Sequence, residues 1–219
     1  SAERPRMSAF LERALLLYQQ GRWELAEREL HQELSEDPNE PWAHALLALC
    51  LLRRGQKEPA TRSARQAVGL APDTSFVHYV LATVLHERNR LDDAERAALE
   101  AVRLDPGSAD CYAALASVRL DRRQWAASLE SAEHGLQADP EHVGCTNLRA
   151  IALRKLGRHD QAAVAIDSAL ARDPDSAVSH ANQGWALLEA GDAPRALEHF
   201  REALRIDPQL EWAQQGIIE

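Results

Sequence analysis

The side chains that could carry chemistry are the histidines, the cysteines and the carboxylates, and their spacing decides which reactions are open to them. Nine histidines occur in the 219 residues, but none stands in the H-E-x-x-H pattern that holds zinc on one helix face. His44, His78 and His180 recur at one phase of a 34-residue period. Equivalent positions on successive elements point along a stack and do not converge on one ion. The row therefore predicts no metal site.

The cysteines predict neither a disulfide framework nor a redox motif. Cys50, Cys111 and Cys145 are odd in number and form no C-x-x-C pair. Cys111 and Cys145 are one period apart, so we expect them on neighbouring helices about 10 Å apart, too far for a bridge. We expect reduced packing residues and a reducing, cytoplasmic compartment.

No catalytic or cofactor-binding constellation is present in the sequence. The glycines never form G-x-G-x-x-G or a phosphate-binding loop, and the carboxylates are spread as solvated charges are. The net charge of −9 argues against nucleic acid as a partner, because phosphate binding requires clustered cations. No apolar run approaches the length of a membrane span. We therefore expect no enzyme, no cofactor, no metal and no membrane insertion within this segment.

The elements that position these side chains are set by a strict internal repeat with a period of 34 residues. A proline marks each period, at Pro38, Pro72, Pro106, Pro140, Pro174 and Pro208. Small residues recur in two rows, at Ala14, Ala48, Ala82, Ala116, Ala150 and Gly184, and at Ala26, Ala60, Ala94, Ser128, Ala162 and Ala196. Six units in register, without insertion or deletion, predict a repeat protein and not one closed core.

Each unit reads as two amphipathic helices, as the stretch from Ala177 to Leu210 illustrates. Apolar or small residues recur at helical spacing in its first half, and Gly191 then supplies a residue that tolerates positive φ. Pro194 follows where a second helix would begin, a position that needs no N–H donor. A hairpin of two such helices cannot bury its apolar faces alone, so neighbouring units must cover them.

The period and its motifs resemble the tetratricopeptide repeat family. The family pattern appears as Leu47-Ala48-x2-Leu51, as Leu81-Ala82-x2-Leu85 and as Ala196-x3-Phe200. The resemblance implies an all-α, right-handed superhelical solenoid of stacked antiparallel helix pairs. It places repeats at 7–40, 41–74, 75–108, 109–142, 143–176 and 177–210, followed by the start of a seventh or capping helix at 211–219. Residues 1–6 are expected to be a disordered lead, as chain termini often are.

Several residues depart from the family pattern. Asn89 and Arg123 replace the turn glycine, and a non-glycine residue adopts the left-handed conformation at some cost, least for asparagine. Glu33 stands where a small residue is usual, and Arg119 where an aromatic residue or leucine is usual. These departures concern local packing and leave the predicted fold unchanged.

The resemblance implies that the first helix of each repeat lines a concave groove for a protein or peptide. The predicted partner-binding residues on that face are Trp42, Leu49, Phe76, Tyr79, Thr83, His86, Asn147, Ile151, Arg154, Asn182 and Trp185. Trp42, Leu49 and Ile151 fit packing between helices equally well. Some members of the family bind the C-terminal carboxylate of a partner through a clamp that needs a basic residue at repeat position 5. At that position this chain has Leu11, Ala45, Tyr79, Ala113, Asn147 and Ala181. None of these is basic, so the resemblance does not extend to the carboxylate clamp.

The sequence therefore predicts a non-enzymatic scaffold that binds a protein segment in its groove. Two alternatives remain open. The chain could be the regulatory or targeting arm of a larger enzyme or membrane-anchored protein that continues beyond Glu219, or a self-assembly module that associates through its last helix. In that helix, Ile217 and Ile218 are expected to pack onto the preceding pair. The arginine- and alanine-rich composition suggests a bacterial source.

Overall fold

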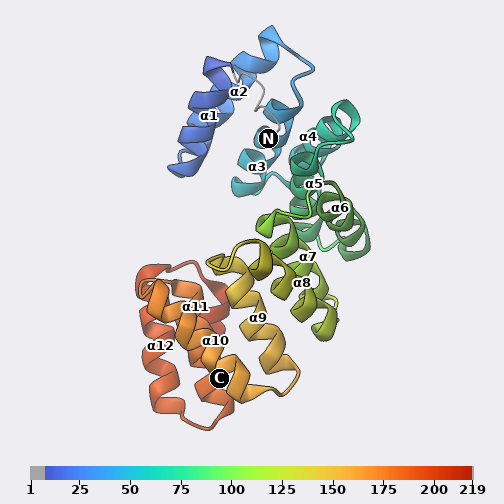
Figure 1. Cartoon of the computed structure of the whole chain (residues 1–219). Helices are drawn as coiled ribbons and strands as arrows, with labels where there is room; N and C mark the ends of the chain where they lie inside the picture. Colours follow the sequence, from blue (N-terminus) through green and yellow to red (C-terminus); the bar gives the residue numbers. More distant parts are fainter. Residues whose placement is uncertain (1–7, 219) are drawn as a thin grey trace. The chain divides into compact units, whose positions relative to one another are not determined.

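A computed structural model describes residues 8–218, and these residues form helices without any strand. The lead expected at residues 1–6 lies outside the described residues. The helices (Figure 1) are α1 (Ala9–Gln19), α2 (Trp23–Glu36), α3 (Pro41–Arg53), α4 (Lys57–Leu70), α5 (Ser75–Glu87), α6 (Leu91–Leu104), α7 (Ala109–Asp121), α8 (Trp125–Ala138), α9 (Val143–Lys155), α10 (His159–Arg172), α11 (Ala177–Glu189), α12 (Ala193–Ile206) and α13 (Glu211–Ile218). The predicted all-α fold of helix pairs is confirmed.

The chain divides into two compact units, and each is described by itself. The first, Ser1–Pro106, contains α1 to α6, and the second, Gly107–Glu219, contains α7 to α13. Within each unit every odd-numbered helix packs on the even-numbered helix that follows it and on the next odd-numbered helix. The odd-numbered helices of a unit therefore form one continuous layer. The stacking of repeats across the boundary between the units stays a prediction.

Small residues let the two helices of each pair approach closely. The two rows of small residues that the period marks are all buried, from Ala14 and Ala26 in the first pair to Gly184 and Ala196 in the sixth. Ser128 is the one hydroxyl in these rows, and its Oγ donates a hydrogen bond of 2.8 Å to the Ala116 carbonyl of the paired helix. A larger side chain in either row would force the helices apart.

In the sixth pair the close approach is made around an aromatic ring. Phe200 is fully buried, and a Cβ added to Gly184 would lie 2.6 Å from its ring, while one added to Gly216 of α13 would lie 2.2 Å from it. Phe200 and Trp185 also make a T-shaped contact, with ring centroids 5.5 Å apart. The Phe200 ring therefore fits between α11 and α13 only because the residues that contact it there, Gly184 and Gly216, are glycines.

The packing of α13 differs from the expected one. Ala213 and Gly216 face the sixth pair, whereas Ile217 and Ile218 are exposed, Ile218 by 85%. The prediction that both isoleucines pack onto that pair was wrong. The bulk of Phe200 explains the difference, because only a residue without a side chain fits against its ring at Gly216.

The turns within the pairs require a left-handed residue. Four of them use glycine, including Gly157 at φ 74°, but Asn89 has φ 57° and Arg123 has φ 60°. The expectation from the sequence is confirmed at both positions. Because the left-handed conformation costs about 1–2 kcal/mol in residues with a Cβ and asparagine offsets part of it, Arg123 is the strained turn residue.

The row of histidines ties helix starts to the preceding turns. His44, His78 and His180 each donate from Nε2 to the carbonyl of the proline six residues earlier, at 2.9, 2.7 and 2.9 Å. Gln214 makes the same bond through its Nε2, at 2.8 Å. A carbonyl only accepts, so Nε2 carries the ring proton in each histidine. The periodic spacing of the histidines thus has a structural explanation at every repeat where it occurs.

Glu33 and Arg119, two further departures from the repeat pattern, have hydrogen-bond partners within their own units. Glu33 is buried, and its carboxylate accepts a hydrogen bond from the Ser8 hydroxyl. The Arg119 guanidinium donates to Ser131 Oγ at 2.8 Å and to the Ala127 carbonyl at 3.3 Å. Each of these polar groups thereby meets a partner of its own unit, which is the condition for keeping it in a core.

Replacing Gly184 by alanine tests the close approach at Phe200. Overpacking of this kind costs about 1–3 kcal/mol, so we expect Gly184→Ala to lower the free energy of unfolding in chemical denaturation. Gly69→Ala is the matched control, since Gly69 is exposed on α4 with no atom near the added Cβ, and alanine favours helix.

A double-mutant cycle gives the cause. The loss from Gly184→Ala should shrink in a Phe200→Leu background, because repeat one pairs Ala14 with Leu30 at the same two positions without conflict. An equal loss in both backgrounds, or an equal effect of Gly184→Ala and Gly69→Ala, would contradict the packing described.

Candidate protein-binding groove

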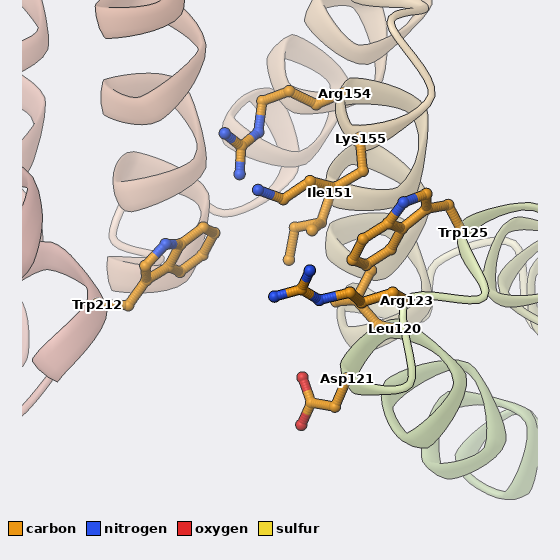
Figure 2. A pocket seen from close by; sticks show the side chains of 8 residues that line it. All are labelled: Leu120, Asp121, Arg123, Trp125, Ile151, Arg154, Lys155 and Trp212. Carbon is orange, nitrogen blue, oxygen red and sulfur yellow. The ribbon is translucent and has the colours of Figure 1, made fainter.

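The second unit contains a pocket of about 440 Å³ on the layer of its odd-numbered helices. The C-terminal parts of α7 and α9, the turn before α8, the first residue of α8 and the first turn of α13 build it (Figure 2). Its lining residues are Leu120, Asp121, Arg123, Trp125, Ile151, Arg154, Lys155 and Trp212. This set is called the Trp125–Trp212 pocket below.

Two indole rings stand on opposite sides of this pocket. Figure 2 shows Trp212 facing Trp125, with Ile151 between them and Leu120 on the same side as Trp125. All four side chains are only partly buried. Apolar surface left open in a recess, with polar groups around it, is the ordinary composition of a site that receives another molecule.

Trp212 is held in place by the sixth repeat. Its ring stacks on Trp185 with centroids 6.4 Å apart and an interplanar angle of 14°. The Trp185 Nε1–H donates to the Trp212 carbonyl at 3.3 Å. Since Trp185 in turn makes a T-shaped contact with the buried Phe200, Trp212 is connected to the core of the sixth repeat.

The three cations of the pocket differ in their surroundings. Arg154 is buried, its Nη1 lies 2.5 Å from Glu189 Oε1, and its guanidinium lies 6.0 Å from the Trp185 ring. Arg123 and Lys155 are exposed, and neither forms an ion pair or side-chain hydrogen bond with another described residue. Arg154 is therefore occupied within the unit, whereas the other two charges face the opening.

The polar residues expected to read a partner, Asn147 and Asn182, are buried and bond to each other. Asn147 Oδ1 accepts from Ser179 Oγ at 3.1 Å and from Asn182 Nδ2 at 3.0 Å. The Ser179 hydroxyl also lies 2.9 Å from Ser176 Oγ. These bonds join α9 to α11, which gives both asparagines a role in stacking two repeats. Contact of either with a partner stays a prediction.

The first unit brings together three aromatic residues that the sequence predicts to bind a partner. Trp42 and Phe76 stack with centroids 4.5 Å apart, and Phe76 and Tyr79 follow at 6.2 Å. Thr83 lies half-buried on the same helix and donates from Oγ1 to the Tyr79 carbonyl at 2.9 Å. Leu49 is buried in the core, in agreement with the packing alternative. His86 is half-buried near the end of α5.

Six lining residues of the pocket were not among the predicted site residues: Leu120, Asp121, Arg123, Trp125, Lys155 and Trp212. One signal was available for Trp212. It stands at the second position of the seventh unit, the phase of Trp42 and Phe76 in units two and three. Arg123 stands in the turn between α7 and α8, and Trp125 is the first residue of α8, so the groove positions of the first helix include neither.

The described residues offer no metal-binding cluster, and two of the cysteines have thiols that are poorly ionised. No group of three or more His, Cys, Asp or Glu residues within 8–218 is arranged to hold a metal ion. Burial raises the pKa of Cys50 and of Cys145 to about 12, so both thiols stay protonated at neutral pH. Within the same residues, no helix combines the length and the apolar character needed to cross a bilayer.

Two sequence models of the tetratricopeptide repeat match the chain, one over residues 59–109, 113–177 and 147–211 and the other over residues 17–75. The chain belongs to the tetratricopeptide repeat family. No protein sequence with curated function matches it at a significant level. The fold of the family is a non-catalytic repeat scaffold in general, with proteins as partners.

Solved structures share the fold at low sequence identity. A chain of the APC/C hetero-tetramer Cut9-Hcn1 superposes with a TM-score of 0.83 at 16% identity, over 96% of this chain and 42% of that one. The present chain thus spans less than half of that protein. Pseudomonas aeruginosa pilF gives 0.74 at 22% identity, over 94% of each chain. YrrB, a TPR protein with an unusual peptide-binding site, gives 0.57 at 17%, over 87% and 98%.

Truncating Asn147 tests its role in joining α9 to α11. Asn147→Ala leaves Ser179 and Asn182 without their shared buried acceptor, which costs about 1–3 kcal/mol. We expect the free energy of unfolding to fall by that amount in chemical denaturation. Gln161→Ala, on the exposed face of α10, serves as the control and should leave stability nearly unchanged. A stable Asn147→Ala variant with altered partner binding would instead assign the residue to recognition.

Proposed function

We propose that this chain is a scaffold that captures a segment of a partner protein in the Trp125–Trp212 pocket of its second unit. The observation that carries the proposal is the open recess between two tryptophans, floored by Ile151 and bordered by the exposed cations Arg123 and Lys155. The tetratricopeptide repeat fold is in general a non-catalytic scaffold that acts through its binding surfaces.

The arrangement suits a protein segment more than a small molecule. The recess is broad and open on the helix layer, and aromatic and arginine side chains are the residues most enriched at the centres of protein interfaces. YrrB, which shares this fold, has a peptide-binding site, and peptide recognition here would be consistent with that. The aromatic row of Trp42, Phe76 and Tyr79 is the corresponding contact surface that we propose for the first unit. The cytoplasmic location stays a prediction.

Blocking the pocket with a bulky label tests the proposal. Because Cys50, Cys111 and Cys145 are buried, a maleimide reacts with an introduced surface thiol in the folded chain. Lys155→Cys carrying a fluorescent maleimide should capture its partner from lysate of the source organism at least about tenfold less than the labelled control, a difference of about 1.4 kcal/mol or more.

The control is Arg201→Cys with the same label. Arg201 is exposed on α12, outside the pocket, and its replacement removes the same charge. Unlabelled Lys155→Cys separates loss of the lysine charge from blockage of the recess, and circular dichroism checks that each variant stays helical. Equal capture by the two labelled proteins would contradict binding in the pocket.

A further inference from the structure

We propose that the Trp125–Trp212 pocket selects a segment in which an aspartate or glutamate adjoins an apolar side chain. This inference rests on the proposed function, since it describes the segment that the pocket receives. The acidic group would lie between Arg123 and Lys155, and the apolar group on Ile151 between the two indole rings.

The charge of the pocket is opposite to that of the chain. The protein carries a net charge of −9, yet the pocket is lined by three cations and one carboxylate. Asp121 already interacts within the chain, and Arg154 is paired with Glu189. Arg123 and Lys155 are left with their charges directed at the recess, where Figure 2 shows both side chains extending into the space in front of Ile151.

The backbone of Arg123 points to the same conclusion. The turn it occupies needs a left-handed residue, and four equivalent turns meet that need with glycine. An arginine at φ 60° is unfavourable for folding, and the fold gains nothing visible from its side chain, which is exposed and bonded to no other described residue. Backbone strain that is not offset by a stabilising contact of the side chain is typical of functional positions. The strained turn places a guanidinium at the mouth of the pocket.

The surroundings also favour a carboxylate over a neutral partner. Indole rings on both sides and Ile151 beneath exclude water when a segment binds, and ion pairs strengthen as the local dielectric falls. An apolar side chain next to the carboxylate would cover Ile151 and Leu120, whose surface is open in the free chain. The two contacts lie side by side in the pocket, so adjacent residues of one segment reach both.

Selection from a library of random peptides displayed on phage tests the inference without a known partner. The full chain is immobilised, and the enriched sequences are read for wild type, Lys155→Glu, Arg123→Gly and the control Arg201→Glu. Lys155→Glu and Arg201→Glu change the net charge equally, one inside the pocket and one on the exposed face of α12. Arg123→Gly removes the cation and relieves the backbone, so it separates binding from stability.

We expect wild type and Arg201→Glu to enrich peptides with Asp or Glu beside an apolar residue. Lys155→Glu should abolish the acidic preference. Arg123→Gly should weaken it while its unfolding midpoint rises. In fluorescence anisotropy, exchanging the acidic residue of the most enriched peptide for its amide should lower affinity for wild type about tenfold, the scale of one charged hydrogen bond.

The outcomes separate the inference from the proposed function. Peptides that compete with the maleimide label at position 155 but show no acidic preference would overturn the inference and leave the binding pocket standing. Enriched peptides that ignore the label, or the absence of any enrichment, would overturn both. An unchanged acidic preference in Lys155→Glu would place the acidic contact elsewhere and likewise overturn the inference.

Discussion

The close approach of paired helices is the constraint on which the rest of the structure depends. Each pair can bury its apolar faces only if small residues stand where the two backbones come nearest, and both rows of these residues are buried in every repeat. Ser128 is the one polar residue in these rows, and it fits because its small side chain donates a hydrogen bond to the backbone of the paired helix. At Phe200 the buried side chain is large, and the close approach is possible because Gly184 and Gly216, which contact its ring, have no side chains. That ring supports Trp185, which holds Trp212 at the pocket.

Most of the helical architecture was predictable from the sequence because its determinants are local. Prolines, turn glycines and apolar spacing recur every 34 residues, and each acts within a few residues of where it stands. Even the two turns without glycine were predicted, since only the left-handed conformation continues the pattern at Asn89 and Arg123. The packing of α13 was not predictable in the same way. Which of its faces meets the sixth pair depends on the bulk of Phe200, a residue in another helix.

The candidate site was less accessible to sequence reasoning for a similar reason. The position of a residue in the repeat tells which side of a helix it occupies. It does not tell whether the next repeat supplies a hydrogen-bond or ion-pair partner for its side chain. Asn147 and Asn182 stand on the inner helices as expected, and their bonds to each other and to Ser179 arise only when two repeats stack. Arg154 likewise has Glu189 of the following repeat as its partner. Arg123 and Lys155 differ from it in lacking such a neighbour among the described residues.

The central claim is that a segment binds between Trp125 and Trp212, and the indole N–H signals in a ¹⁵N–¹H correlation spectrum report on it most directly. The chain has five tryptophans, and each gives one such signal. On titration with an enriched acidic peptide, the signals of Trp125 and Trp212 should shift, while those of Trp23 and Trp42 in the first unit stay in place. Binding that moves Trp42 and leaves Trp125 and Trp212 unchanged would contradict the account.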